Sequence, residues 1–224
     1  MLILGLDTSG KDGSIALVAC GDEPSRALEV VPLEGGTFSA QLVPQIAFLL
    51  QKHGLRKDDI DAFAVVSGPG SFTGLRVGLA AIKALGEILQ KPIVPVSLLE
   101  AVAVAAGSQG RINAALDAGR GEVYAGTYEV RNSVATCISE RVISAADLAA
   151  ELVNARVVTR DQKQADVLTK AGVTIQSVAG LRADDIERIG YGKLQRGETV
   201  SPEALDATYI RRSEAEIKFA ERTR

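Results

Sequence analysis

The chain has a single histidine, His53, two cysteines, Cys20 and Cys137, and no tryptophan. A structural zinc site usually takes four Cys or His ligands, which these residues cannot supply. One histidine also argues against a histidine metal pair or a Ser-His-Asp triad. Both cysteines lie in apolar, strand-like stretches, where we expect buried thiols rather than disulfides, as in the reducing cytoplasm. We therefore expect no tightly bound metal.

Long apolar runs and an excess of positive charge are missing as well. The longest apolar run, Val94–Ala106, contains Glu100 and is shorter than the roughly 20 residues of a transmembrane helix. The first ten residues include no basic residue and reach Asp7, so we expect no signal peptide. The net charge of −3 gives no general attraction to nucleic acid or to an anionic membrane. Contact with RNA would need a local patch or a partner.

The composition that remains is typical of a globular protein. Of the 224 residues, 46% are hydrophobic and 24% are charged, which excludes a disordered, collagen-like or coiled-coil chain. Aromatic residues make up only 4%, so the core must consist mainly of Val, Ile, Leu and Ala. The 22 glycines indicate turns and close backbone contacts.

The hydrophobic pattern of the first half predicts three strands before the first helix. Apolar residues at three- and four-residue spacing mark that helix, with Thr37 or Ser39 as its N-cap and Gly54 as its stop signal. The predicted elements are strands at Met1–Leu6, Ser14–Cys20 and Arg26–Leu33, a helix at Thr37–His53, a strand at Ala62–Val66, a helix at Thr73–Leu89, a strand at Pro92–Val96 and a helix at Ser97–Ala106.

The same order begins again in the second half. Ile112–Gly121 resembles Ile3–Asp12, because in both an apolar strand runs into Leu-Asp and a turn of small residues. Each half places three strands before its first helix, unlike the βαβ alternation of a Rossmann sheet. We therefore predict an α/β protein with a duplicated ribonuclease-H-like, actin-like architecture, divided into residues 1–107 and a shortened half, 108–224. The further elements are strands at Ile112–Asp117, Val123–Tyr128 and Thr136–Val142, a helix at Ala145–Val153, a strand at Val157–Arg160, a helix at Lys163–Ala171, a strand at Val173–Val178 and a helix at Asp184–Arg196.

Asp7 and Asp117 each end the first strand of a half and have two interpretations. In actin-like phosphotransferases, carboxylates at these strand ends hold Mg²⁺ or its waters near the phosphates of a nucleotide. Alternatively, each aspartate caps a hairpin turn by accepting backbone N–H groups.

The segment SGPGSFTGLRVG, Ser67–Gly78, joins a predicted buried strand to a helix through a glycine-rich turn. N–H groups at a helix start can bind an anion, but the segment matches neither a Walker A loop nor the G-x-G-x-x-G spacing. Gly74 and Gly78 cost helix stability, so we favour a face that another helix or backbone approaches closely. The candidate vestigial nucleotide cleft comprises Asp7, Thr8, Ser9, Gly68, Gly70, Ser71, Thr73, Arg76 and Asp117.

These motifs resemble those of a known family. Ser67–Gly78 is similar to the signature of the bacterial TsaB (YeaZ) family, the non-catalytic subunit of the machinery that makes threonylcarbamoyladenosine at position 37 of tRNAs reading ANN codons. Four further segments match in order, so that the resemblance covers nearly the whole chain: Leu4–Ser9, Ser39–Pro44, Leu116–Tyr124 and Tyr209–Arg211.

The resemblance implies an actin-like fold, a homodimer, a heterodimer with the transferase TsaD, and a complex that the ATPase TsaE joins. It also implies tRNA contact through that complex, and ATP or ADP only within it. The metal-holding HxxxH pair of TsaD cannot exist in a chain with one histidine. Two positions depart from the family pattern: Phe38, where many relatives carry histidine, and Gly119, where many carry arginine, with Arg120 one place later. A polar role at positions 38 and 119 is therefore in doubt.

These features lead to a scaffold hypothesis: an accessory subunit, itself inactive, that dimerises with TsaD. An alternative is an active actin-like ATPase or kinase that uses Asp7, Asp117 and the Gly68–Gly74 turn. A third hypothesis, a metallopeptidase, is disfavoured because the chain has one histidine. We predict the association surface on helices Ser39–His53 and Thr73–Leu89, where arginine at Ile46 or Leu79 should block it. Its expected residues are Ser39, Leu42, Val43, Ile46, Gly74, Leu75, Gly78, Leu79 and Ile82.

Overall fold

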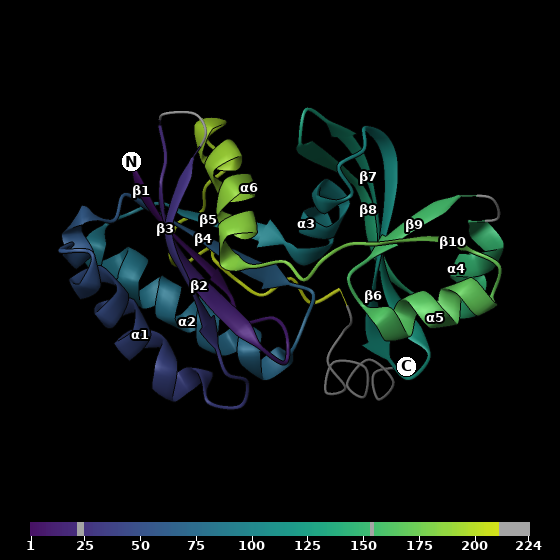
Figure 1. The fold of residues 1–224 in the computed structure, drawn as a ribbon, viewed down its shortest axis with the longest axis horizontal. Coiled ribbons are helices and arrows are strands. Elements are labelled where there is room, and N and C mark those ends of the chain that lie inside the picture. Colours follow the sequence, from purple (N-terminus) through teal and green to yellow (C-terminus); the bar gives the residue numbers. More distant parts are fainter. Residues whose placement is uncertain (22–24, 153–154, 211–224) are drawn as a thin grey trace, which may run out of the picture. The chain divides into compact units, whose positions relative to one another are not determined.

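The computed structural model describes residues 1–21, 25–152 and 155–210 (Figure 1). The chain forms two compact units. The first contains Met1–Ala101 together with Ala179–Ala207, and the second contains Val102–Val178 and the described residues from Thr208 on. Arg211, which closes the Tyr209–Arg211 match, lies outside the described residues.

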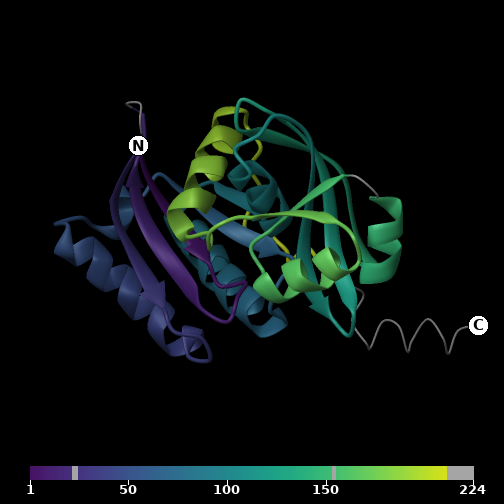
Figure 2. The same ribbon diagram turned by 45° about the vertical axis from the view of Figure 1, so that its right-hand side comes forward.

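The first unit is built on a mixed five-stranded sheet of order β3-β2-β1-β4-β5. β2 is antiparallel to both β1 and β3, whereas β4 is parallel to β1 and β5. Two helices, α1 and α2, pack against one side, and the late helix α6 packs against the other, mainly on β1, β4 and β2 (Figures 1 and 2). The elements are β1 (Leu2–Asp7), β2 (Gly13–Ala19), β3 (Arg26–Leu33), α1 (Phe38–Lys52), the 3₁₀ turn η1 (Lys57–Asp59), β4 (Ala62–Gly68), α2 (Phe72–Leu89), β5 (Ile93–Ser97) and α6 (Ala183–Gln195). The helix α3 (Leu98–Ala105) contains the point, after Ala101, at which the first unit ends and the second begins.

The second unit repeats this topology in a sheet of order β10-β9-β6-β7-β8. β6 corresponds to β1, because it pairs antiparallel with the next strand, β7, and parallel with β9. The core contains Ala115, Val123 and Val157 of the sheet with Leu148 and Leu168 of the helices. The elements are β6 (Gly110–Gly119), β7 (Glu122–Arg131), β8 (Val134–Ser144), α4 (Ala145–Glu151), β9 (Arg156–Thr159), α5 (Gln162–Lys170) and β10 (Thr174–Ser177).

The structure divides the chain differently from the expected halves, 1–107 and 108–224. Residues 179–207 return to the first unit, where Ala183, Ile186 and Gly190 of α6 are buried. The reason is close backbone approach: a Cβ at Gly5 of β1 would overlap the carbonyl oxygen of Ala183, and one at Gly190 would overlap Ala64. The apolar stripe of this helix was readable in the sequence, but not which sheet it covers.

The predicted elements are present, with shifted ends. β6 and β8 are longer than expected, and η1 was not predicted. Thr37 occupies the N-cap position of α1 without a side-chain cap hydrogen bond, and Gly54 follows the helix with a φ of 68°. No helix among the described residues is long and apolar enough to cross a membrane.

The two cysteines differ in environment, and neither forms a disulfide. Cys20 is buried, as expected, but Cys137 is exposed, because it lies on β8 at the edge of its sheet. Burial, followed by the hydrogen bond to Glu187, raises the pKa of Cys20 to about 12. Since the thiolate is the reactive form, Cys20 should be inert in the native protein.

We predict that a thiol reagent such as dithionitrobenzoate will modify one cysteine rapidly in native protein and both after unfolding. The measurement is absorbance against time with and without denaturant. Cys137→Ser should remove the fast reaction and Cys20→Ser should leave it. A fast phase that disappears with Cys20→Ser instead would contradict the burial of Cys20.

Candidate functional site

Asp7 ends β1, and its carboxylate accepts hydrogen bonds within the turn that follows. Its side chain is 3% exposed, and its Oδ1 accepts hydrogen bonds from the backbone N–H of Ser9 at 2.8 Å and from the Ser9 hydroxyl at 2.6 Å. Thr8 next to it donates from Oγ1 to the carbonyl of Gly74 at 2.8 Å, and Ser71 N–H donates to the Ser9 carbonyl at 2.7 Å. The turn after β1 is thus joined to the start of α2.

Asp117 forms the equivalent turn at the end of the Leu-Asp pair in the second unit. Its Oδ1 accepts from the N–H of Gly119 at 2.8 Å, the same i-to-i+2 bond that Asp7 makes. Its Oδ2 lies 3.3 Å from Lys163 Nζ at the start of α5. The geometry of both aspartates therefore favours turn capping. Within residues 1–21, 25–152 and 155–210, no group of three or more His, Cys, Asp or Glu side chains is arranged to hold a metal ion.

The glycine-rich segment serves close packing between α2 and β1. A Cβ at Gly70 would lie 2.5 Å from the carbonyl oxygen of Ser9, and Cβ atoms at Gly74 and Gly78 would overlap Thr8. Ser71 caps α2 by accepting the N–H of Gly74 at 3.3 Å. The favoured packing interpretation is confirmed, with the contact made by the backbone and side chain of Thr8 rather than by a second helix.

A surface pocket of about 650 Å³ lies at this end of the first unit. It is lined by the turn Gly10–Asp12, the segment Glu34–Gly36 and the first turns of α1 and α2. Of the candidate cleft residues, Ser71 and Thr73 reach this pocket, while Asp7, Gly68 and Arg76 do not line it. Phe38, which stands where many relatives have histidine, is buried and lines it as well. This pocket therefore brings together only two of the candidate cleft residues, Ser71 and Thr73.

The predicted association residues divide sharply by exposure. Val43 is 58% exposed and Ser39 is exposed, but Ile46 and Leu79 are each only 5% exposed. The proposed Ile46→Arg and Leu79→Arg substitutions are therefore the wrong test, since they would disturb folding. The remaining predicted residues are also buried within the subunit: Leu42, Gly74, Leu75, Gly78 and Ile82.

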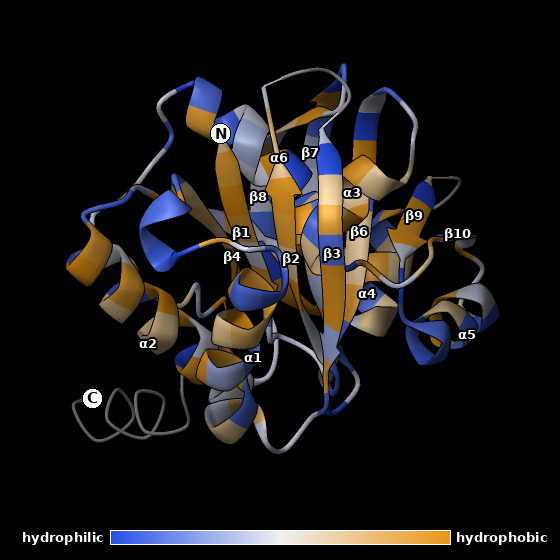
Figure 3. Cartoon of the chain, turned by 60° about the vertical axis from the view of Figure 1, so that its left-hand side comes forward, coloured by the Kyte–Doolittle hydropathy of each residue, from blue (hydrophilic) through white to orange (hydrophobic). Residues whose placement is uncertain are grey.

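Further side chains, mostly apolar, are exposed on the same two helices, and together with Val43 we call them the outer face. Phe48 is 59% exposed, Phe72 46% and Ile88 68%. On α2 five exposed residues recur at four-residue spacing, the row that forms a ridge on a helix: Phe72, Arg76, Ala80, Ala84 and Ile88. Figure 3 shows apolar colour along both helices. The outer face consists of Ala40, Val43, Pro44, Ala47 and Phe48 on α1 and of Phe72, Arg76, Ala80, Ala84 and Ile88 on α2.

Most of the outer face was not among the predicted association residues. Apolar residues of α1 and α2 that pack inside the subunit were assigned to that surface instead. The spacing in the sequence could have indicated this surface. Phe72, Ala80, Ala84 and Ile88 recur in one row that lies outside the buried stripe of α2. Arg76, assigned to the nucleotide cleft, lies in this row instead.

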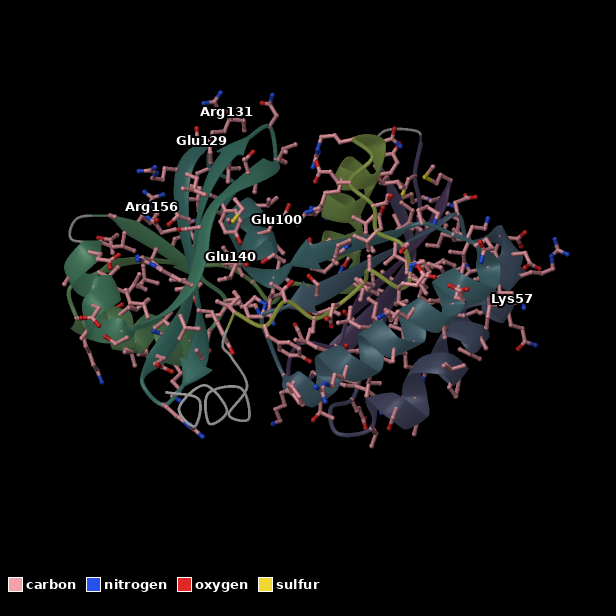
Figure 4. The ribbon with its side chains drawn as sticks, turned by 180° about the vertical axis from the view of Figure 1, so that it is seen from behind. Lys57, Glu100, Glu129, Arg131, Glu140 and Arg156 are labelled. Atoms are coloured by element: carbon pink, nitrogen blue, oxygen red, sulfur yellow. The ribbon has the colours of Figure 1, made fainter. Side chains whose placement is uncertain are left out.

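Two buried carboxylates hold α6 in place. Glu100 at the start of α3 (labelled in Figure 4) is 3.1 Å from Lys193 Nζ, and Glu187 accepts a hydrogen bond from Cys20 Sγ at 2.8 Å. Burial raises the pKa of both carboxyl groups; Lys193 opposes the rise at Glu100, and the Cys20 hydrogen bond opposes it at Glu187. Both contacts join α6 to the first unit, while burial disfavours the charged form of each carboxyl group.

We predict that the stability of the protein depends on pH through Glu187. The pKa of Glu187 is higher in the folded than in the unfolded protein. Its contribution to the free energy of unfolding is therefore fully present below the unfolded pKa and is lost as the pH rises through the folded pKa. Glu187→Gln should therefore gain stability relative to wild type as the pH rises above the ordinary glutamate pKa of about 4.3. Urea unfolding at several pH values measures this, with Glu34→Gln, at an exposed position, as control. Parallel pH profiles for wild type and Glu187→Gln would contradict it.

Two sheets of the same strand order, each with an Asp-capped turn after its first strand, define a duplicated α/β protein of the ribonuclease-H-like, actin-like class. Residues 30–190 match the family described as "TsaD: tRNA N6-adenosine threonylcarbamoyltransferase". The Escherichia coli protein named tRNA threonylcarbamoyladenosine biosynthesis protein TsaB is 30% identical over 96% of both chains. The chain therefore belongs to the TsaB family.

Further relatives agree with this assignment. The Bacillus subtilis protein of the same name is 34% identical over 60% of this chain and 58% of its own length. A crystal structure of YeaZ from Pseudomonas aeruginosa has a TM-score of 0.76 at 27% identity, covering 93% of this chain and 100% of that one. A second structure from that organism, described as similar to the peptidase YeaZ, has a TM-score of 0.77 at 29% identity, covering 94% and 99%. The predicted fold class and family are confirmed.

Proposed function

We propose that this chain acts in the biosynthesis of N6-threonylcarbamoyladenosine at position 37 of tRNAs reading ANN codons, as a non-catalytic subunit that docks onto the transferase TsaD. Membership of a family whose relatives are named for this biosynthesis supports the pathway. The observation that carries the docking role is the outer face, where apolar side chains stay exposed on two adjacent helices. Exposed apolar patches of this kind mark protein interaction sites.

The same surface serves two associations in this proposal. A second copy of the chain and TsaD both dock on α1 and α2, so they compete, and excess TsaD converts the homodimer into the heterodimer. The ATPase TsaE joins the heterodimer, tRNA is reached through the complex, and ATP or ADP is bound only there. We place the complex in the cytoplasm.

The non-catalytic role rests on what the candidate chemical groups already do. Asp7 and Asp117 cap turns, and Thr8 is tied to the backbone of α2. The single histidine, His53, lies 2.9 Å from Glu29 Oε2, where it joins the end of α1 to β3. This histidine contact is thus with a carboxylate rather than with a hydroxyl or thiol nucleophile, which weighs against a peptidase of the Ser-His or Cys-His kind.

The proposal is tested by reconstituting tRNA modification from purified TsaD, TsaE, the threonylcarbamoyl-adenylate donor, ATP and substrate tRNA. Omission of this chain should abolish or strongly reduce multiple turnover. Asp117→Asn, which keeps an acceptor oxygen for Gly119 N–H, should restore most of the activity. The isolated chain should show no ATP turnover with Mg²⁺.

Two results would replace the scaffold role by the ATPase or kinase alternative. One is metal-dependent ATP turnover by the isolated chain. The other is an Asp117→Asn protein that binds TsaD normally but fails as completely as omission.

A further inference from the structure

The pocket of about 650 Å³ between the starts of α1 and α2 is shaped by close contacts within the fold. Gly35 packs so closely on the turn after β1 that an added Cβ would lie 1.6 Å from the carbonyl oxygen of Lys11. Gln41 holds the loop before α1, because its side chain accepts the N–H of Glu34 at 3.3 Å and donates to the carbonyl oxygen of Glu34 at 3.2 Å. The pocket is therefore preformed, which lowers the entropy cost of filling it.

The lining of this pocket favours an apolar occupant over an ion. Its buried and partly buried side chains are those of Phe38 and Val77. The charged residues of the lining are exposed and carry both signs: Lys11, Asp12 and Glu34. Mixed charges at the mouth select neither an anion nor a cation, whereas a concave apolar lining fits a large apolar side chain.

Phe48 is a large apolar side chain on the outer face of the same helix. It is 59% exposed, whereas Leu49 and Leu50 next to it are buried. The subunit thus leaves the ring in water, where it gains nothing from the hydrophobic effect until another molecule covers it. Phe48 does not reach the pocket of its own subunit, because it lies about 13 Å along α1 from Ser39 at the mouth.

A second copy of the chain can bring its ring to this pocket. In two antiparallel copies of α1 related by a twofold axis, residue pairs whose numbers have the same sum face each other across the axis. With the axis just after Val43, Phe48 of the second copy lies opposite Ser39. The residues between them that also face each other, Ala40 and Ala47, are small enough for the two helices to approach closely.

We propose that Phe48 of a second copy fills the pocket between the starts of α1 and α2, and that the twofold axis makes the contact reciprocal. This inference rests on the proposed function, in which two copies associate through these helices, and it adds the contact that holds them together. Aromatic side chains seated in pockets supply much of the binding energy of an interface. Because the contact occurs twice in each homodimer, a change in the ring or in the pocket acts twice.

The first experiment joins the two surfaces by a disulfide in the full chain carrying Cys137→Ser, which removes the exposed thiol. Ser39→Cys and Phe48→Cys proteins are oxidised separately and as an equal mixture. The mixture should give at least tenfold more cross-linked dimer than either protein alone, since only the mixed dimer brings the two thiols together. Ser39→Cys mixed with Val167→Cys, at an exposed position of α5, is the matched control and should not cross-link.

The second experiment measures dissociation of the homodimer by sedimentation. Phe48→Ala should weaken the homodimer at least tenfold, and Phe48→Leu should recover part of the loss. Ser39→Trp, which fills the pocket from its own mouth, should also weaken it at least tenfold, whereas Thr169→Trp, at an exposed position of α5, should not. Phe48→Ala and Ser39→Trp combined should lose less than the product of the single losses, because both act on one contact.

The outcomes separate this inference from the proposed function. A wild-type chain that dimerises while the cysteine mixture cross-links no more than the single variants overturns the contact alone. So does a Phe48→Ala protein that dimerises as tightly as wild type. A wild-type chain that stays monomeric also overturns the contact, and it overturns the proposed docking role as well if it fails to bind TsaD. Melting temperatures close to wild type establish that the variants are folded.

Discussion

Arginine at Val43 or Phe48 should weaken binding to TsaD by more than 100-fold while leaving the protein folded. Both side chains are more than half exposed in the subunit, so the charge remains hydrated until a partner covers it. In the complex the charge would be buried against apolar atoms, which costs several kcal/mol when it has no partner. The homodimer should be weakened in parallel.

The measurement is the dissociation constant together with the melting temperature of each variant. Val167→Arg, at a 41% exposed apolar position on α5 of the second unit, is the matched control and should bind as wild type. Ile46→Arg should instead lower the melting temperature steeply, because that side chain is buried. Normal binding by folded Val43→Arg and Phe48→Arg would remove the outer face from the interface.

Adding one methyl group at Gly74 should destabilise the protein by about 1–2 kcal/mol. The new Cβ would overlap the carbonyl oxygen of Thr8, a backbone atom at the end of β1 that cannot move without disturbing the Asp7 turn. Overpacking of this kind typically costs about 1–3 kcal/mol, and here the gain of up to about 1 kcal/mol in helix propensity only partly offsets it.

The matched control is the same substitution at Gly192 of α6, where the nearest atom to an added Cβ is 3.5 Å away on the flexible side chain of Arg196. Gly192→Ala should stabilise the protein by up to about 1 kcal/mol, since alanine favours a helix. Denaturant unfolding of both variants gives the two signs. Gly74→Ala as stable as Gly192→Ala would mean that α2 and β1 are not packed as closely as described.

The candidate site shows where sequence reasoning was sufficient. Asp7 and Asp117 follow the same Leu-Asp pattern, and both form the turn that the pattern allows, because an Asx turn is a local interaction between residues two apart. The glycines of Ser67–Gly78 likewise predicted a close approach, since four-residue spacing places them on one helix face. The identity of the approaching group, Thr8, was not readable, because it lies far away in the sequence.

The sequence by itself determined the elements of this protein, their order and the duplication, because hydrophobic period and turn residues act over a few neighbouring positions. Only the tertiary structure decided which sheet α6 covers and which apolar residues of α1 and α2 remain exposed. Ile46 and Val43 are both aliphatic residues of one helix, yet one is buried and the other is exposed. Their exposure differs because of how α1 is rotated against a sheet formed by residues distant in the chain. The local sequence of the helix does not determine that rotation.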